Sequence, residues 1–191
     1  MSRASLSQTK SGAGPSDAAL VVAARSNEAW AIEALYRRYV RVAVGLAHRL
    51  LPIDEEVDDL VQDCFINAFQ QLGRLENPQA FGAWLGSIVV RTASKRLRRR
   101  RLLLRLGLKR NEVPNLDTLI ANTAPPDLAT EVRKLYAVIE AFPAEERAAI
   151  ILRNVEGFEV QQVAEYMSVS LSTAKRRLAA AERRLKKLGG E

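Results

Sequence analysis

The sequence predicts an all-α protein in which two small helical domains are joined by a flexible linker. Strand patterns are nearly absent, whereas apolar residues recur three and four positions apart over long stretches, the spacing that lines one face of a helix. This periodicity fails near the middle of the chain and then resumes. A chain of 191 residues with 48% hydrophobic residues is large enough to bury both cores.

The first domain is expected over 17–106, after a small polar tail at 1–16 that we expect to be disordered and that lacks the apolar stretch of a signal peptide. A short leading helix at 17–29 precedes three longer ones. Their apolar stripes are Ile32, Leu35, Tyr39, Val42, Leu46 and Leu50; Val57, Leu60, Val61, Cys64, Phe65, Ala68 and Leu72; and Phe81, Trp84, Leu85, Ile88 and Val89. Cys64 is therefore interpreted as a core residue.

The linker is expected over 107–127 and the second domain over 128–191. Gly107 and the prolines at 114, 125 and 126 interrupt the helical pattern, and residues 111–131 carry four acidic residues and no basic one. In the second domain a stripe of Val132, Leu135, Val138 and Ile139 precedes Pro143, which suits the first turn of a helix carrying Ala148, Ile151 and Leu152.

A helix-turn-helix is predicted at about 158–187. Phe158, Val163, Ala164 and Met167 mark a short helix, Ser168-Val169-Ser170 a tight turn, and Ser170 can cap the longer helix that follows. The apolar face of the longer helix is Leu171, Ala174, Leu178, Ala181, Leu185 and Leu188, and the opposite face holds Ser172, Thr173, Arg176, Ala179, Ala180, Arg183 and Lys187. Such a helix fits the major groove of DNA, although an ordinary helical hairpin with a solvated basic face shows the same pattern.

The charge distribution also indicates a polyanionic partner. Lys and Arg number 29 against 22 acidic residues, which gives a net charge of +7 and a pI near 9.9. Residues 91–110 hold ten of the basic residues and no acidic one, a density that phosphates would neutralise. A solvated basic surface, or a solubilising or targeting segment, is the alternative interpretation.

The opposite charge gathers at 54–63, where six carboxylates stand without a basic residue. The positive end of the helix dipole accounts for some of them. In projection, however, Asp59, Gln62, Asp63 and Gln70 share the outward face of the helix with Ile66. An apolar residue ringed by acids and amides resembles a protein-docking patch.

Several protein classes are excluded by composition. One cysteine and one histidine, His48, allow neither a disulfide framework nor a Cys/His zinc site, and no nucleophile pair or phosphate-binding loop is present. No apolar run approaches the ~20 residues of a membrane span. We therefore expect a cytoplasmic, non-enzymatic protein without a metal or another cofactor.

Two blocks of sequence resemble the sigma-70 family of bacterial RNA polymerase sigma factors. The runs AIEALYRRY from Ala31, EVDDLVQDCF from Glu56, AWLGSI from Ala83 and RRRR from Arg98 resemble region 2. The run AFPAEERAAIILR from Ala141, followed by Glu156-Gly157-Phe158 and the helix-turn-helix, resembles region 4. With both regions in order and no domain between them, the chain is similar to the extracytoplasmic-function (ECF) group.

The resemblance implies a sigma factor that binds core RNA polymerase at its β′ clamp and β flap and directs it to promoter DNA, and it implies an anti-sigma factor as a further partner. The linker would thread toward the RNA path of the polymerase. The implied polymerase-docking residues are Asp58, Asp59, Gln62, Asp63 and Ile66; those for melting and reading the −10 element are Arg74, Asn77, Arg91, Lys95, Arg98 and Arg99; and those for reading the −35 element are Ser172, Thr173, Lys175, Arg176 and Arg183.

The chain departs from the family pattern at five positions. Arg91 and Lys95 stand where the family commonly has Asn and Asp, and Ala180 and Glu182 where it often has arginines. Ser168 replaces the usual turn glycine, at a cost of about 1 kcal/mol if its backbone is left-handed. We expect an unusual promoter preference and weaker −35 binding. The rival hypotheses are a free-standing helix-turn-helix regulator and a helical protein-interaction module with an acidic partner.

Overall fold

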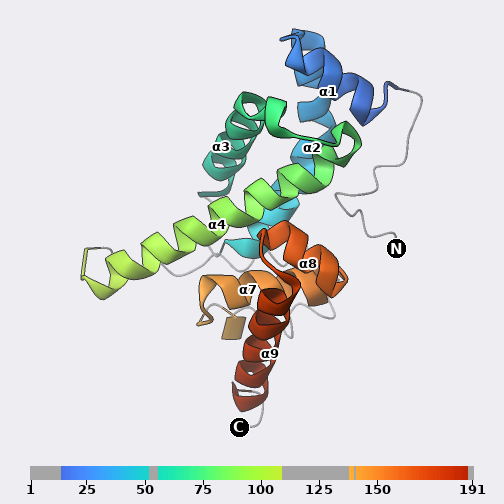
Figure 1. Cartoon of the computed structure of the whole chain (residues 1–191). Coiled ribbons are helices and arrows are strands. Elements are labelled where there is room, and N and C mark those ends of the chain that lie inside the picture. Colours follow the sequence, from blue (N-terminus) through green and yellow to red (C-terminus); the bar gives the residue numbers. More distant parts are fainter. Residues whose placement is uncertain (1–13, 52–55, 109–137, 140, 189–191) are drawn as a thin grey trace, which may run out of the picture.

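The computed structural model describes residues 14–51, 56–108, 138–139 and 141–188, and all regular structure within them is helical (Figure 1). The predicted all-α fold is therefore confirmed. The tail at 1–13, most of the linker, and Val132 and Leu135 lie outside the described residues. The helices are α1 (Asp17–Arg25), α2 (Ala29–Leu50), α3 (Val57–Gln70) and α4 (Phe81–Arg105), followed by α7 (Ala144–Ile150), α8 (Val160–Met167) and α9 (Leu171–Leu188). The 3₁₀ turns η2 (Leu72–Arg74) and η3 (Pro78–Ala80) connect α3 to α4, and the π-helical turn η5 (Ile151–Val155) extends α7.

Local sequence signals set the helix ends. Ser16 begins α1, its Oγ accepting a hydrogen bond from the amide of Ala19 at 3.2 Å. At the end of α4, Gly107 has a φ of 68°, and the Leu108 amide donates to the carbonyl of Leu103 at 2.9 Å. This is the glycine-terminated helix end that satisfies the last carbonyls, so α4 stops where the sequence predicts the linker to begin.

The predicted stripes form the core of the first domain. Leu35 and Tyr39 of α2, Leu60 and Phe65 of α3, and Phe81 of α4 are each at most 3% exposed. Aromatic rings connect these helices, with the Tyr39 and Phe81 ring centroids 5.4 Å apart. The margins of the stripes, Ile32, Val42 and Trp84, are half-buried.

Cys64 is fully buried, as predicted. Burial raises the pKa of its thiol to about 11, while a hydrogen bond with Thr92 acts in the opposite direction. The thiol is therefore protonated at neutral pH and is a packing group.

The central helix α4 lies between the two halves of the molecule. In Figure 1 it runs diagonally, with α1 and α3 above it, α7–α9 below it, and its C-terminal end projecting beyond both. It packs against α2 and α3 on one side and against α7 and α8 on the other. The buried residues of both halves consequently form one continuous cluster.

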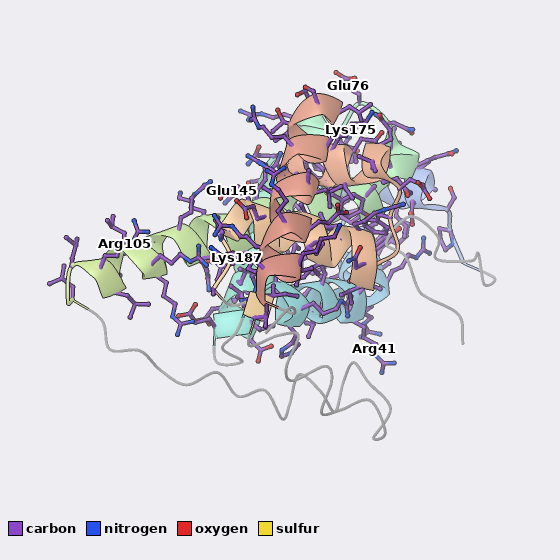
Figure 2. The ribbon with its side chains drawn as sticks, turned by 90° about the horizontal axis from the view of Figure 1, so that it is seen from below. Arg41, Glu76, Arg105, Glu145, Lys175 and Lys187 are labelled. Carbon is purple, nitrogen blue, oxygen red and sulfur yellow. The ribbon has the colours of Figure 1, made fainter. Side chains whose placement is uncertain are left out.

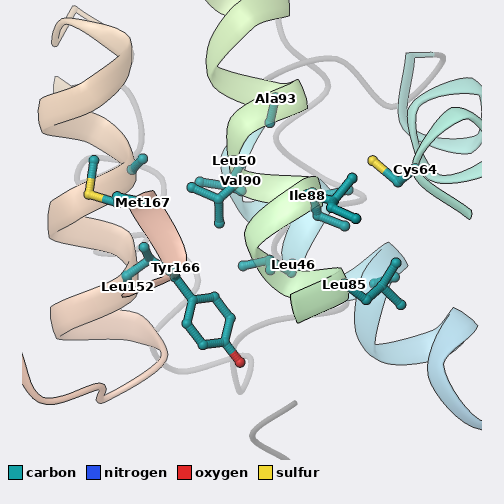
Figure 3. Packing of buried hydrophobic residues seen from close by; sticks show 14 of the residues in the cluster. Leu46, Leu50, Cys64, Leu85, Ile88, Val90, Ala93, Leu152, Tyr166 and Met167 are labelled. Atoms are coloured by element: carbon teal, nitrogen blue, oxygen red, sulfur yellow. The ribbon is translucent and has the colours of Figure 1, made fainter. Parts of the chain in front are cut away.

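The sequence predicted one buried face on α4, whereas the helix is buried on two. Gly86, Ser87, Val90 and Ser94 lie off the predicted stripe and are all buried. Small side chains allow neighbouring helices to approach closely, but they carry little hydrophobic signal. This second face is turned toward α8, where Met167 lies across from Val90 in the close-up of Figure 3.

Candidate protein and nucleic-acid interfaces

The predicted docking patch lies on the outer face of α3. The helix turns its apolar side, including Leu60, Cys64 and Ala68, into the core, and this orientation leaves the other side in solvent. Ile66 is 49% exposed on that outer side. All five predicted residues are exposed on this one helix: Asp58, Asp59, Gln62, Asp63 and Ile66.

One member of the docking patch has a second contact. Asp63 accepts a hydrogen bond from Arg96 of α4 at 2.6 Å, and Arg96 also donates to the carbonyl of Glu56 at 3.0 Å. The Asp63 side chain keeps 63% of its surface exposed. Asp63 therefore ties α3 to α4 while it remains available at the surface.

An aromatic residue beside the patch was missed by the sequence reasoning. Tyr36 of α2 is 44% exposed, and its ring lies edge-on against Phe65, 4.8 Å between centroids. The projection of a single helix cannot find such a neighbour, because Tyr36 comes from α2. An exposed tyrosine next to the buried stripe residue Leu35 was the available signal. Its ring contact, Phe65, is the residue that precedes Ile66 in α3.

The loop between α3 and α4, which carries the predicted −10 residues Arg74 and Asn77, is supported by α1. Arg25 donates from Nε to the carbonyl of Leu72 at 3.2 Å and from Nη2 to the carbonyl of Leu75. Within the loop, Asn77 caps η3 by accepting from the Gln79 amide at 3.1 Å, and Arg74 donates to Gln71 at 3.1 Å. Arg74 and Asn77 are both exposed.

The remaining predicted −10 residues lie far along α4 from this loop. At about 1.5 Å per residue, Arg99 is about 27 Å along the helix from Phe81. Lys95 and Arg99 line a cavity of about 490 Å³ between α3 and α4, together with Arg96 and the buried Arg100. Glu56 and Asp63 line the cavity as well, so basic side chains outnumber acidic ones where a phosphate chain could run.

Arg91 and Arg98 contact the second half of the chain, and Lys95, which lies between them on α4, lines the cavity at this contact as well. Arg91 Nη1 donates to the hydroxyl of Ser168 at 2.9 Å, and Arg98 forms an ion pair with Glu145 of α7. The structure therefore divides the predicted −10 residues among the loop, the cavity and this contact.

The predicted −35 residues lie on α9. Ser170 caps the helix as predicted, accepting from the Thr173 amide at 3.3 Å, and its hydroxyl also contacts those of Ser172 and Thr173. Lys175, Arg176 and Arg183 are exposed, and Figure 2 shows Lys175 and Lys187 along this helix, while Arg105 lies at the distant end of α4.

The structure also shows the surroundings of the α9 positions that depart from the family pattern. Ala180 is half-buried and Glu182 is exposed. Arg184 forms an ion pair with Glu146 of α7 at 2.6 Å, so this arginine holds α9 to α7. Ser168 has a φ of 52° and a ψ of 49°, so its backbone is left-handed. In this conformation a serine has a higher conformational free energy than the glycine that is usual in the family.

Within the described ranges, no group of His, Cys, Asp and Glu side chains could hold a metal ion. Over the same part of the chain, no helix is both long and apolar enough to cross a membrane.

Comparison with known proteins gives the family. The sigma-70 region 2 model matches residues 35–102 and the sigma-70 region 4 model matches residues 133–185. The chain is 30% identical to the ECF RNA polymerase sigma factor SigM of Mycobacterium tuberculosis, over 92% of this chain and 85% of that one. It is 28% identical to the ECF RNA polymerase sigma-E factor of Escherichia coli K12, over 85% and 88%.

Solved structures show the same fold. The structure of CnrH in complex with the cytosolic domain of CnrY has a TM-score of 0.59 at 24% identity, covering 90% of this chain and 96% of that one. The sigma factor RpoE, in complex with the anti-sigma factor NepR from Bartonella quintana, has a TM-score of 0.62 at 22% identity, covering 82% and 94%. The chain belongs to the ECF group of the sigma-70 family. Members are non-catalytic initiation factors that direct RNA polymerase to promoters.

Proposed function

We propose that this sigma factor docks on core RNA polymerase through the outer face of α3 and reads promoters with two separate surfaces. The loop at 72–80 and α4 would engage the −10 element, and α9 the −35 element. The observation that carries the proposal is that one chain exposes two different surfaces. The acidic patch around Ile66 lies on α3, and the basic face of α9 lies in the other half of the chain. A free-standing regulator needs only the second of these surfaces. Because transcription takes place on the chromosome, the protein would act in the cytoplasm.

The docking surface has the composition of a binding hot spot. Ile66 supplies exposed apolar area on the helix that also carries the exposed carboxylates of Asp58 and Asp59, and Tyr36 adds an exposed ring against Phe65. Acidic groups there would complement basic side chains on the β′ clamp. The charge would speed association and fix the orientation of the complex.

The docking proposal is tested by Asp59→Arg combined with Ile66→Arg. Both positions are solvent-exposed, so the fold should be kept, while affinity for core polymerase should fall by about 2 kcal/mol or more, about thirtyfold. The matched control is Gln161→Arg combined with Glu165→Arg, which adds the same charge on exposed positions of α8. If the α3 double variant binds core as tightly as the control, the patch is not the docking surface.

The −35 proposal is tested by Arg176→Ala, since this side chain lies on the exposed face of α9. If Arg176 reads a base, binding should weaken by about 1–3 kcal/mol and preference should relax at one promoter position. A uniform loss over all sequences, with a shallower dependence on salt, would assign Arg176 to a phosphate instead.

We also propose an anti-sigma factor as a partner. The support is that the similar solved structures of CnrH and RpoE are complexes, the second explicitly with an anti-sigma factor. Co-purification of a partner that lowers the affinity for core polymerase, and that the Asp59→Arg, Ile66→Arg variant no longer binds, would support a shared surface. A partner bound equally by both proteins would place its site elsewhere.

A further inference from the structure

One side of α4 carries a run of basic side chains that lines the cavity of about 490 Å³ against α3. The lining positions on α4 recur three or four residues apart, so they form a single stripe along the helix. This stripe consists of Thr92, Lys95, Arg96, Arg99, Arg100 and Leu103. The opposite wall of this α3–α4 cavity carries Glu56 and Asp63.

The α3–α4 cavity has an open side and a sheltered side. Lys95 and Arg99 are exposed, Thr92 and Leu103 are half-buried, and Arg100 is only 8% exposed. Few water molecules surround a guanidinium that is so shielded, and its attraction for an anion is therefore stronger than that of a cation in bulk water. An anionic group that entered from the open side would meet its strongest attraction at Arg100.

Positive charge is in excess around the α3–α4 cavity. Four basic side chains and two carboxylates line it, so two positive charges are left over. Arg96 is held at the wall, because it pairs with Asp63 at 2.6 Å and donates to the carbonyl of Glu56 at 3.0 Å. A ligand that complements this cavity must therefore carry at least two negative charges.

The size of the cavity favours a small ligand over a strand of DNA. Its volume lies within the range of about 300–1,000 Å³ that is usual for small-molecule sites. A DNA strand is long and carries its phosphates one nucleotide apart, whereas linked phosphates concentrate several charges in a small volume. Arginine forks suit phosphate oxygens, and Leu103 offers an apolar contact to a ligand that also carries a base or a sugar.

We propose that the α3–α4 cavity binds a small ligand with a chain of linked phosphates, supplied by an inorganic polyphosphate or by a nucleoside polyphosphate. The bound ligand would occupy Lys95 and Arg99, which the proposed function assigns to the −10 element. It would therefore lower promoter opening. This regulatory part rests on the proposed function, whereas the binding site itself does not.

The first test measures binding by calorimetry on the full-length protein in transcription buffer. The probes are inorganic tripolyphosphate, GTP and orthophosphate. Leu103→Glu places a carboxylate in the cavity, and the matched control Leu102→Glu adds the same charge on the adjacent residue, which is 57% exposed. Tripolyphosphate should bind at least about tenfold more tightly than orthophosphate, and Leu103→Glu should weaken its binding at least about tenfold. Leu102→Glu should change this affinity by less than about threefold.

The comparison of probes identifies the source of the phosphates. Tighter binding of GTP than of tripolyphosphate supports a nucleoside polyphosphate, and equal affinities support an inorganic chain. Equal losses in the two glutamate variants, or no binding of either probe to the parent, overturn the proposed site. Binding of single-stranded DNA alone, weakened by Leu103→Glu, also overturns it and leaves the cavity to the −10 element.

A circular dichroism spectrum checks that each variant is folded. If Leu103→Glu unfolds, Lys95→Ala combined with Arg99→Ala takes its place, since both positions are exposed. Its control is Arg176→Ala combined with Arg183→Ala, which removes the same charge from exposed positions of α9. The α4 pair must then lose at least about tenfold more affinity for tripolyphosphate than the α9 pair for the site to stand.

The second test addresses regulation. Open complexes of core polymerase with each protein are followed by permanganate footprinting, on a promoter selected by the parent from a random library and at constant free Mg²⁺. Relative to the same protein without ligand, saturating tripolyphosphate should reduce opening at least about fivefold for the parent and Leu102→Glu, but less than about twofold for Leu103→Glu. Equal inhibition of all three overturns the regulatory part. No opening by the parent without ligand overturns the proposed function, while the calorimetric result still decides the binding site.

Discussion

Ser168 provides a direct test of the turn geometry on which the helix-turn-helix depends. Its φ of 52° and ψ of 49° are left-handed, which costs a residue with a Cβ about 1–2 kcal/mol. Ser168→Gly removes this cost, but glycine gives the unfolded chain more backbone freedom, which lowers the free energy of unfolding by about 0.5–1 kcal/mol. Ser168→Ala keeps the Cβ. Both variants lose the hydroxyl that accepts from Arg91, so the difference between them isolates the backbone.

We expect Ser168→Gly to be more stable than Ser168→Ala by about 0.5–1 kcal/mol, which is about 1–4 °C in Tm for a chain of this size. Urea unfolding followed by circular dichroism measures the difference, and the two m-values should agree. An alanine variant as stable as the glycine variant would show that the turn is not left-handed at this position. The family preference for glycine there would then need another cause.

Three further outcomes follow from single side chains. Arg25→Ala should destabilise the protein by about 1.5–3 kcal/mol in thermal unfolding, because two loop carbonyls lose a charged donor, and an unchanged Tm would contradict the role of α1 in holding the loop. Cys64, whose pKa is raised to about 11, should react with a thiol reagent at pH 8 only at the rate of global unfolding, and faster labelling would show a local opening. Burial alone would raise the pKa of Glu145, but a backbone hydrogen bond and the contacts with Arg98 and Arg177 lower this pKa below its ordinary value. The ionised Glu145 carboxylate therefore stabilises the fold above the ordinary carboxyl pKa, and this stabilisation is lost as the pH falls through the lowered pKa. Glu145→Gln should remove this part of the acid dependence of unfolding, and an identical pH profile would refute the assignment.

Helix positions were predictable because periodicity reports burial directly. The 3.6-residue repeat alone predicts the burial of the stripe through Leu35 and Tyr39, and Gly107 alone predicts the end of α4. The second buried face of α4 was not predictable in this way. Ser87 and Ser94 are small and polar, so their burial follows from the approach of a neighbouring helix and not from their own hydrophobicity.

The same distinction applies to the candidate surfaces. Projection of one helix placed Asp59 and Ile66 correctly on the outer face of α3, because a single element decides which side faces solvent. The pairs that bring α4 to other elements involve residues far apart in sequence, such as Arg98 with Glu145. Such pairs depend on tertiary placement, on which the helical repeat carries no information.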